Sequence, residues 1–327
     1  MKVLLTGASG LLGGNVARLL HQRGYALRLL ARPGSRLDHL ADLDYELVET
    51  QFDQAGQLPT AVHGCDAVIH AAANTAQWPN RLDHFHPVNV QATIDLVTAA
   101  REAGVGKFVF VSTANTIGPG TRDAPGNEWN EFELYALGSG YINSKFLAER
   151  YVLEQAGRGF PAVVVNPTFM LGELDVKPSS GRLLIHALQS RRHWVPPGGK
   201  NFIPVRDAAQ GVVGALEKGR PGERYLLAGE NLSFREFFAL VDRVADARTP
   251  QVPLPRWLIL LVGRAGDWWG RLSGQAVPIN AVTSRLMCLD NFYTGAKARE
   301  ELAMPDTPLE EGIREAIAWF RAQGMIE

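Results

Sequence analysis

A glycine-rich turn close to the start of the chain constrains the fold more than any other segment. The turn Thr6-Gly7-Ala8-Ser9-Gly10-Leu11-Leu12-Gly13 lies between an apolar run, Lys2–Thr6, and an amphipathic stretch, Leu11–Gln22. Glycines at this spacing allow a tight turn, close approach of the backbone to a pyrophosphate, and close packing of helix on strand. The helix N-terminus also offers free N–H groups and a positive dipole to phosphates. A dinucleotide-binding unit of strand, turn and helix is therefore predicted here.

The first half of the chain continues this alternation of short apolar runs with helical stretches. Continuous apolar strands that alternate with helices favour a parallel sheet covered on both faces. We therefore predict an α/β fold, a Rossmann-type doubly wound parallel sheet with a smaller, interleaved, mostly helical lobe that binds the substrate. The predicted strands are Lys2–Thr6, Ala26–Ala31, Tyr45–Val48, Ala67–Ala71, Lys107–Ser112 and Ala162–Asn166, and the predicted helices are Leu11–Gln22, His86–Ala103 and Leu134–Gln155.

After Pro167 the alternation loosens, which indicates a second lobe. Helices are predicted over Val205–Lys218 and Ser233–Ala245, with a strand at Arg224–Leu227 between them. We expect residues 1–168 and 201–228 to form the nucleotide-binding lobe. Residues 169–200 and 229–327 are expected to form the substrate-binding lobe.

Composition excludes several classes of protein. The formal net charge of -1 gives no electrostatic argument for a nucleic-acid partner. Two cysteines, Cys65 and Cys288, are too few for a disulfide framework and lack the spacing of metal ligands, so no metal is expected. An apparent strand from Lys2 leaves no room for a signal peptide, so a cytoplasmic location is expected. The expected partner is a small-molecule substrate.

The longest apolar stretch, Trp257–Val262, is too short to span a bilayer. A buried helix or a substrate lid is the favoured interpretation, and membrane contact is not expected. The alternative is an interfacial anchor, with Trp268 and Trp269 at the level of the lipid headgroups.

The end of the second predicted strand bears on the choice of cofactor. A carboxylate at this place would hydrogen-bond the free 2′-hydroxyl of an adenosine ribose. The chain instead has Arg32, followed by Pro33, Gly34 and Ser35. Because a guanidinium suits a 2′-phosphate, the sequence predicts NADP(H) rather than NAD(H). The alternative is that Arg32 is a solvated surface arginine.

Tyr141 and Lys145 stand four residues apart in a predicted helix, so their side chains share one face. A free tyrosine has a pKa of about 10, and a nearby ammonium lowers it. Such a phenol can exchange a proton with a carbonyl or hydroxyl oxygen. Thr113 follows the fifth strand at the edge where such sheets bind ligands, and its hydroxyl can hydrogen-bond a reacting oxygen. Turn formation is the alternative role for Thr113.

Five motifs occur in the order typical of one superfamily. They are Thr6–Gly13, His70-Ala71-Ala72-Ala73, Asn89-Val90-Gln91-Ala92-Thr93, Val111-Ser112-Thr113-Ala114 and Tyr141–Lys145. On these motifs the chain resembles the extended short-chain dehydrogenase/reductases of the epimerase/dehydratase type, over nearly its whole length. The segment Asn166–Gly172 is similar to that of the dihydroflavonol-reductase-like and 3β-hydroxysteroid-dehydrogenase-like branch.

The resemblance implies a set of site residues. Thr113, Tyr141 and Lys145 would be catalytic. Relatives often end the third strand in Gly-Asp-Leu, whereas this chain has Gln51-Phe52-Asp53, so the adenine contact is left open between Gln51 and Asp53. The implied cofactor contacts are Gly7, Ser9, Gly10, Leu11, Leu12, Gly13, Arg32, Ser35, Gln51, Phe52, Asp53, Ala71, Ala72, Ala73, Asn89, Tyr141, Lys145, Pro167, Thr168 and Phe169.

The residues after Thr113 restrict the set of reactions that the protein could catalyse. Sugar-nucleotide dehydratases of the superfamily typically carry Asp-Glu there, whereas this chain has Ala114 and Asn115, which disfavours dehydration. We predict an NADPH-dependent carbonyl reductase, reversibly an alcohol dehydrogenase, for an apolar or aromatic ketone or aldehyde. The predicted substrate contacts are Trp78, Thr113, Ile117, Tyr141, Phe169, Trp194 and Phe202.

Two other functions stay open at this point. A nucleotide-sugar epimerase would need cations for a pyrophosphate, and the candidates are Lys177, Arg182, Arg191, Arg192, Lys200 and Arg206. A non-catalytic NADP(H) sensor typically loses the tyrosine or the lysine, and both are present here. A homodimer through His86–Ala103 and Leu134–Gln155 is a further expectation from the resemblance.

Overall fold

One seven-stranded sheet is the centre of the computed structural model, which describes residues 1–50, 55–76, 78–277 and 279–327. The strand order is β10-β6-β5-β4-β1-β2-β3, and all neighbours are parallel. The strands are β1 Lys2–Thr6, β2 Ala26–Ala31, β3 Glu46–Glu49, β4 Ala67–His70, β5 Lys107–Val111, β6 Ala162–Pro167 and β10 Arg224–Leu227. The predicted strands of this sheet are confirmed, each with its ends within one residue.

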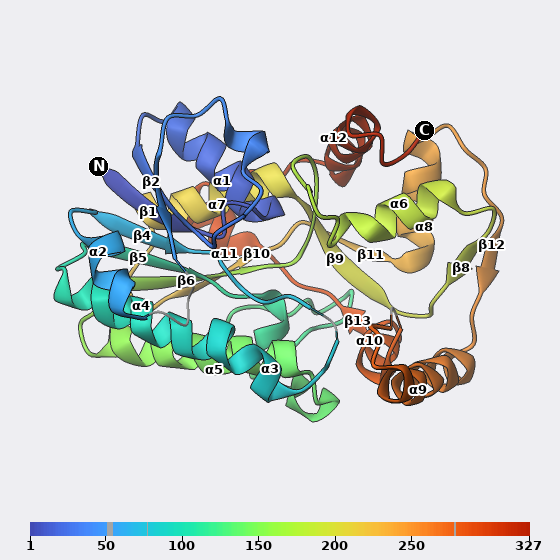
Figure 1. The fold of residues 1–327 in the computed structure, drawn as a ribbon. Coiled ribbons are helices and arrows are strands. Elements are labelled where there is room, and N and C mark those ends of the chain that lie inside the picture. Colours follow the sequence, from blue (N-terminus) through green and yellow to red (C-terminus); the bar gives the residue numbers. More distant parts are fainter. Residues whose placement is uncertain (51–54, 77, 278) are drawn as a thin grey trace.

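Helices cover both faces of this sheet, as predicted for a doubly wound fold (Figure 1). Strand residues alternate between the two apolar cores: Val3 and Leu5 belong to the core under α1 and α7, and Leu4 to the core on the opposite face. Both sets are buried, which explains why the strands read as continuous apolar runs. The covering helices are α1 Leu11–Gln22 and α7 Val205–Glu217 on one face, and α2 Leu58–Val62, α4 Ala92–Glu102 and α5 Gly140–Gly157 on the other.

Two predicted helices are broken in the structure. The stretch 134–155 is a short turn, η5 Leu134–Leu137, followed by α5, because Gly138 adopts a left-handed φ of 69° and Ser139 caps the new helix at Ile142 N. The stretch 86–103 divides into α3 Leu82–His86, a π-helical turn η3 Pro87–Gln91, and α4. Pro87 lacks the N–H that a regular helix would use here.

The remaining elements form a smaller region that the sequence predicted only in part. β7, β9, β11 and β13 make one small sheet, and β8 pairs with β12. Its strands are β7 Phe169–Leu171, β8 His193–Val195, β9 Gly199–Pro204, β11 Glu230–Ser233, β12 Gln251–Pro253 and β13 Asp290–Asn291. Its helices are α6 Gly181–Gln189, α8 Phe234–Val244, α9 Arg256–Ser273, α10 Ala281–Leu286, α11 Ala296–Leu302 and α12 Leu309–Ala322. Short turns at Asp38–Leu40, Ala55–Gln57 and Ala114–Thr116 complete the described elements.

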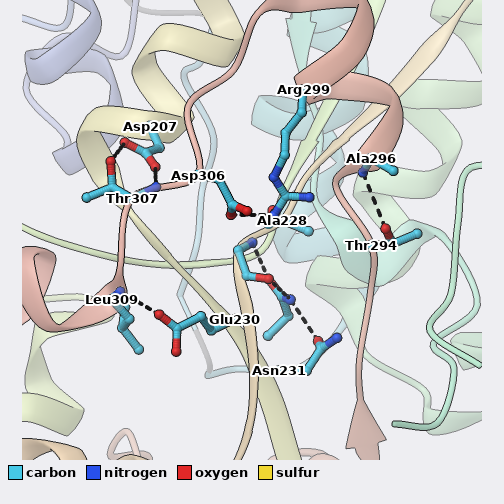
Figure 2. A network of polar contacts seen from close by, with 12 residues as sticks. Asp207, Ala228, Glu230, Asn231, Thr294, Ala296, Arg299, Asp306, Thr307 and Leu309 are labelled. Atoms are coloured by element: carbon cyan, nitrogen blue, oxygen red, sulfur yellow. Dashed lines mark hydrogen bonds and ion pairs between the residues drawn. The ribbon is translucent and has the colours of Figure 1, made fainter. Parts of the chain in front are cut away.

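A polar network ties the C-terminal segment to the central sheet (Figure 2). Asp207 on α7 accepts hydrogen bonds from the backbone N and the Oγ1 of Thr307, at 2.8 and 2.9 Å. Glu230 accepts one from Leu309 N at 2.7 Å, immediately before α12 begins. Arg299 pairs with Asp306 and donates to Ala228 O. These contacts fix the smaller region against the carboxyl edge of the sheet.

Neither a membrane span nor a metal cluster occurs among the described residues. No described helix is long and apolar enough to cross a bilayer. No group of three or more His, Cys, Asp or Glu side chains in that part of the chain could hold a metal ion.

Candidate active site

The glycine-rich turn has the geometry that a bound pyrophosphate requires. Gly7 has a φ of 80°, and a Cβ added there would lie 2.7 Å from the carbonyl carbon of Ala71. A Cβ on Gly13 would lie 2.1 Å from Gly7 O, so α1 packs against the turn only because this residue lacks a side chain. No side chain caps the N-terminus of α1 at Gly10. This cradle therefore fits a dinucleotide phosphate.

The exit of β4 lies directly beside this turn. Ala72 N donates to Thr6 Oγ1 at 3.0 Å, and Thr6 Oγ1 lies 2.8 Å from His70 Nδ1. Burial lowers the pKa of His70 to about 3, so the ring is neutral at physiological pH. The predicted contacts Ala71 and Ala72 thus meet the glycine turn.

A cavity of about 350 Å³ lies at the end of β2. It combines three cationic side chains with two hydroxyls and is open to the turn at Ser9. Its lining residues are Ser9, Arg32, Pro33, Gly34, Ser35, Arg36, Val176 and Lys177. The sequence singled out Arg32 and Ser35, and the fold adds Lys177 from a distant segment. Gln51, Phe52 and Asp53 lie outside the described residues.

Thr113, Tyr141 and Lys145 come together at the carboxyl end of β5. A side-chain hydrogen bond joins Thr113 and Tyr141. Lys145, which is 2% exposed, donates from Nζ to Val111 O at 2.8 Å and lies 4.1 Å from the centre of the Phe110 ring. The structure therefore places the predicted phenol, hydroxyl and ammonium around one point of the sheet edge.

Burial dominates the electrostatics of these groups. It raises the pKa of Tyr141 to about 12, and the hydrogen bond with Thr113 acts in the opposite direction. The sequence led us to expect that Lys145 lowers this pKa, but the ammonium is turned toward Val111 O. Burial lowers the pKa of Lys145 to about 7, against the favourable charge of Glu149. In the structure described, Tyr141 is thus a protonated phenol at neutral pH.

Glu149 is a site residue that sequence reasoning missed. It follows Lys145 by four residues on the same face of α5 and is buried. Its Oε2 accepts hydrogen bonds from Ser112 Oγ, Thr116 Oγ1 and Asn166 Nδ2, at 2.5, 2.6 and 2.9 Å. Arg224 on β10 lies 3.3 Å from Oε1. The sequence feature that could have identified Glu149 is its place four residues after Lys145, on a helix that faces the sheet.

Asn89 holds two segments of the site together. Its side chain accepts from Asn74 N at 2.7 Å and donates to Asn74 O and Ser144 Oγ, at 3.0 and 2.9 Å. Ser144 Oγ also contacts Tyr141 O at 2.7 Å. Asn89 therefore fixes the loop after β4 against α5, and its contact with a cofactor stays a prediction.

The segment after β6 lies across the same edge. Pro167 ends β6, and Thr168 Oγ1 bonds Asn201 Oδ1 at 2.7 Å. The Phe169 ring is half-buried on β7, with Lys200 Nζ 5.3 Å from its centre. Phe169 and Lys200 are thereby placed beside the predicted nicotinamide end of the site.

The predicted apolar substrate contacts separate into three groups. Trp78 and Phe169 are half-buried, the former against Gly270 of α9. Ile117 and Phe202 are fully buried in apolar clusters, the latter stacked on Phe237 with ring centres 4.4 Å apart. Trp194 is 52% exposed on β8, at the far end of the smaller region (Figure 1). Apolar character alone did not distinguish core residues from pocket residues.

Known proteins resemble this chain over its whole length. It is 28% identical to sterol demethylase protein B of Methylococcus capsulatus, over 100% of both chains. It is 32% identical to the 4-hydroxy-2-methyl-3-oxo-4-farnesyl-3,4-dihydroquinoline-1-oxide ketoreductase of Stigmatella aurantiaca, over 92% of this chain and 91% of that protein. The crystal structure of a nucleoside-diphosphate-sugar epimerase from Pseudomonas aeruginosa superimposes with a TM-score of 0.81 at 30% identity, covering 100% of this chain and 99% of the other.

The family comparison agrees with the geometry of the site. The profile of the NAD dependent epimerase/dehydratase family matches residues 3–228, from β1 to the end of β10. The matched segment includes the glycine turn, Thr113, Tyr141 and Lys145. These observations identify an NAD(P)-dependent oxidoreductase, and the chain belongs to the NAD dependent epimerase/dehydratase family.

Proposed function

We propose that this protein is an NADPH-dependent carbonyl reductase that acts on an apolar or aromatic ketone or aldehyde. The observation that carries the proposal is that Thr113, Tyr141 and Lys145 come together at the ligand-binding edge of the sheet, with Lys145 Nζ 2.8 Å from Val111 O. A phenol with a pKa of about 12 keeps its proton at neutral pH and can donate it to an oxygen that becomes more basic. A carbonyl oxygen that gains negative charge needs such a donor.

Thr113, Tyr141 and Lys145 have different roles in the reaction at the substrate oxygen. When bound, the nicotinamide cofactor supplies a hydride to the carbonyl carbon. Tyr141 donates its proton to the carbonyl oxygen, and Thr113 supplies a second hydrogen bond to that oxygen. When Tyr141 gives up its proton, Lys145 would have to turn from Val111 O toward the phenolate, where its ammonium would stabilise that anion. The negative charge of Glu149 raises the pKa of Lys145 and so favours its charged form.

The cavity at the end of β2 supports the preference for NADPH. Arg32, Arg36 and Lys177 line it together with the hydroxyls of Ser9 and Ser35. Three cations with hydroxyl donors suit a 2′-phosphate, which carries negative charge and several acceptor oxygens. A free ribose 2′-hydroxyl is uncharged and would not need three cations around it.

The substrate class follows from the side chains beside Tyr141 and from the relatives. Trp78 and Phe169 offer aromatic surface at this edge. The relative from Stigmatella aurantiaca is named for reduction of a farnesylated ketone, and the relative from Methylococcus capsulatus for sterol demethylation. Both names indicate substrates with large apolar parts, which agrees with the aromatic lining.

A nucleotide-sugar epimerase is the second candidate, and Lys200 is the observation in its favour. Its ammonium lies over the Phe169 ring, where it could meet a substrate phosphate. Two of the other candidate cations have different roles in the structure: Arg206 pairs with Glu311 and Glu315, and Lys177 lines the cofactor cavity. A pyrophosphate binds better to several convergent cations than to one, so the reductase is preferred.

One assay separates these functions and the sensor. The purified protein is mixed with NADPH and a panel of apolar ketones, aromatic aldehydes and nucleotide sugars, and absorbance and product formation are followed. Consumption of NADPH with formation of an alcohol supports the reductase. Interconversion of sugars without net oxidation of NADPH supports the epimerase. Tight NADPH binding without turnover across the panel supports the sensor and contradicts the proposal.

A further inference from the structure

Helix α9 (Arg256–Ser273) has its glycines and Ile259 turned inward and most of its large residues turned outward. A Cβ on Gly266 would lie 2.0 Å from Ile279 O, and a Cβ on Gly270 would lie 2.8 Å from Trp78 Cζ2. Gly263 is equally confined by Ser284. These contacts fix the rotation of the helix about its axis. Apart from Ile259, the usual order of an amphipathic helix, with bulky apolar side chains toward the core, is therefore reversed.

The outward face of α9 carries large apolar side chains. Trp257, Leu261, Trp268 and Leu272 are 66%, 56%, 64% and 65% exposed. At 3.6 residues per turn these four positions fall within an arc of about 60°. Trp269 and Val262 border them and are also exposed. We call these six residues the α9 apolar face. A contiguous exposed face of this kind marks an interaction site rather than ordinary surface.

Positive charge accompanies the α9 apolar face. Arg264 and Arg271 are exposed along one flank of the helix, and Arg256 begins it, against a single acidic residue, Asp267. A cavity of about 210 Å³ at this end of the helix is lined by Leu137, Arg256, Leu260, Arg285 and Leu289. Tryptophan and leucine flanked by arginine suit the boundary between anionic headgroups and acyl chains.

We propose that the α9 apolar face docks on the surface of a membrane that contains anionic phospholipids, with the helix parallel to the surface. The tryptophan rings enter the interface and the flanking arginines contact lipid phosphates. A second copy of the chain suits this face less well. A two-fold contact through α9 would bring Arg264 and Arg271 of both copies together, with only Asp267 to offset them.

The docked helix contacts a loop that in turn contacts the start of α5. Gly270 of α9 packs on Trp78. Two residues after Trp78, Asn80 accepts a hydrogen bond from Gly140 N at 2.8 Å and donates one to Gly138 O at 3.1 Å. Gly140 directly precedes Tyr141. The docking proposal itself does not depend on the proposed function.

Vesicle flotation tests the docking. The full chain is mixed with vesicles of pure phosphatidylcholine, or of equal parts phosphatidylcholine and phosphatidylglycerol, and floated through a density gradient. We expect binding to the anionic vesicles, weakened by added salt. The double variant Trp257→Gln/Trp268→Gln should bind at least ~10-fold more weakly. Trp129→Gln and Trp194→Gln, which remove exposed tryptophans from other elements, are the matched controls and should bind like the unmodified chain.

Three results would overturn the proposal. The first is absence of the chain from the floating fraction with both vesicle types. The second is a loss of binding in the control variants as large as that in the α9 variant. The third is a dimer in sedimentation velocity that the α9 variant dissociates, which would assign the face to a second copy of the chain. Reduction of a water-soluble ketone without vesicles is measured on the same samples, so that a failed reductase and a failed docking site are told apart.

Discussion

Helices α5 and α9 have the same length, 18 residues, and both depart from the usual amphipathic order. α5 buries polar side chains against the sheet, among them Lys145 and Glu149, and holds Tyr141 half-buried beside them. α9 buries glycines and exposes tryptophan and leucine. Burial of ionisable groups lowers the stability of a protein and is found where those groups take part in catalysis. Exposure of large apolar groups lowers solubility and is found where the surface binds a partner. The two departures therefore mark different functions, and variants on each helix should affect different measurements.

Replacement of the phenol on α5 should have the largest effect. Tyr141→Phe removes the proton donor and keeps the ring, so we expect carbonyl reduction to fall by about 10³-fold. NADPH binding, measured by fluorescence titration, should change little, because the ring shape and Lys145 remain. The matched variant on α9, Trp268→Phe, should keep its turnover of a water-soluble ketone. Retained activity in Tyr141→Phe would remove this residue from the mechanism.

Loss of the buried carboxylate on α5 should affect both stability and pH dependence. Glu149→Gln leaves Arg224 without its partner and removes a charged acceptor from Ser112 and Thr116. We expect a loss of about 3 kcal/mol in the free energy of unfolding, measured by urea denaturation. Glu128→Gln is the control for a purely structural effect. Glu128 lies outside α5, and its Oε1 accepts a hydrogen bond from Leu226 N.

The pH profile of the same variant separates positioning from folding. Lys145 must be protonated to stabilise the Tyr141 phenolate, so kcat/KM for reduction should fall as pH rises through its pKa of about 7. The charge of Glu149 raises this pKa, so Glu149→Gln should move the falling limb to lower pH. A limb that stays in place, while stability drops, would limit Glu149 to a structural role.

Recognition of the cofactor lies outside both helices and should respond separately. Arg32→Asp places a carboxylate where a 2′-phosphate would lie, so we expect NADPH to bind about 10- to 100-fold more weakly while NADH binding holds or improves. Both dissociation constants are measured by titration calorimetry. Arg36→Asp, on the same cavity but already near Asp38, should have a smaller effect. An unchanged ratio in Arg32→Asp would refute the assignment to NADPH.

The sequence predicted those features that depend on neighbouring residues in the chain. The glycine turn and α1 are specified by local spacing, and so is the face shared by Tyr141 and Lys145. The missed features depend on contacts between distant segments. Glu149 is recognised as part of the site only when Asn166 and Arg224 are seen to reach it. The exposure of Trp257 follows from the packing of Gly266 against Ile279, which no local pattern shows.

Glycine substitutions are expected to have the smallest effects. Each of the two helices contains a glycine, and the two glycines have different surroundings. Nothing lies within 4 Å of a Cβ built on Gly157, at the end of α5, whereas a Cβ on Gly266 of α9 meets the backbone oxygen of Ile279 at 2.0 Å. Gly157→Ala should therefore raise the free energy of unfolding by about 0.5–1 kcal/mol, since alanine favours the helix. Gly266→Ala should lower it by about 1–3 kcal/mol, because the backbone must move to accept the methyl group. Urea denaturation of both variants measures the difference. Equal effects would mean that α9 can rotate or shift at low cost, and the fixed outward direction of the α9 apolar face would then lose its structural basis.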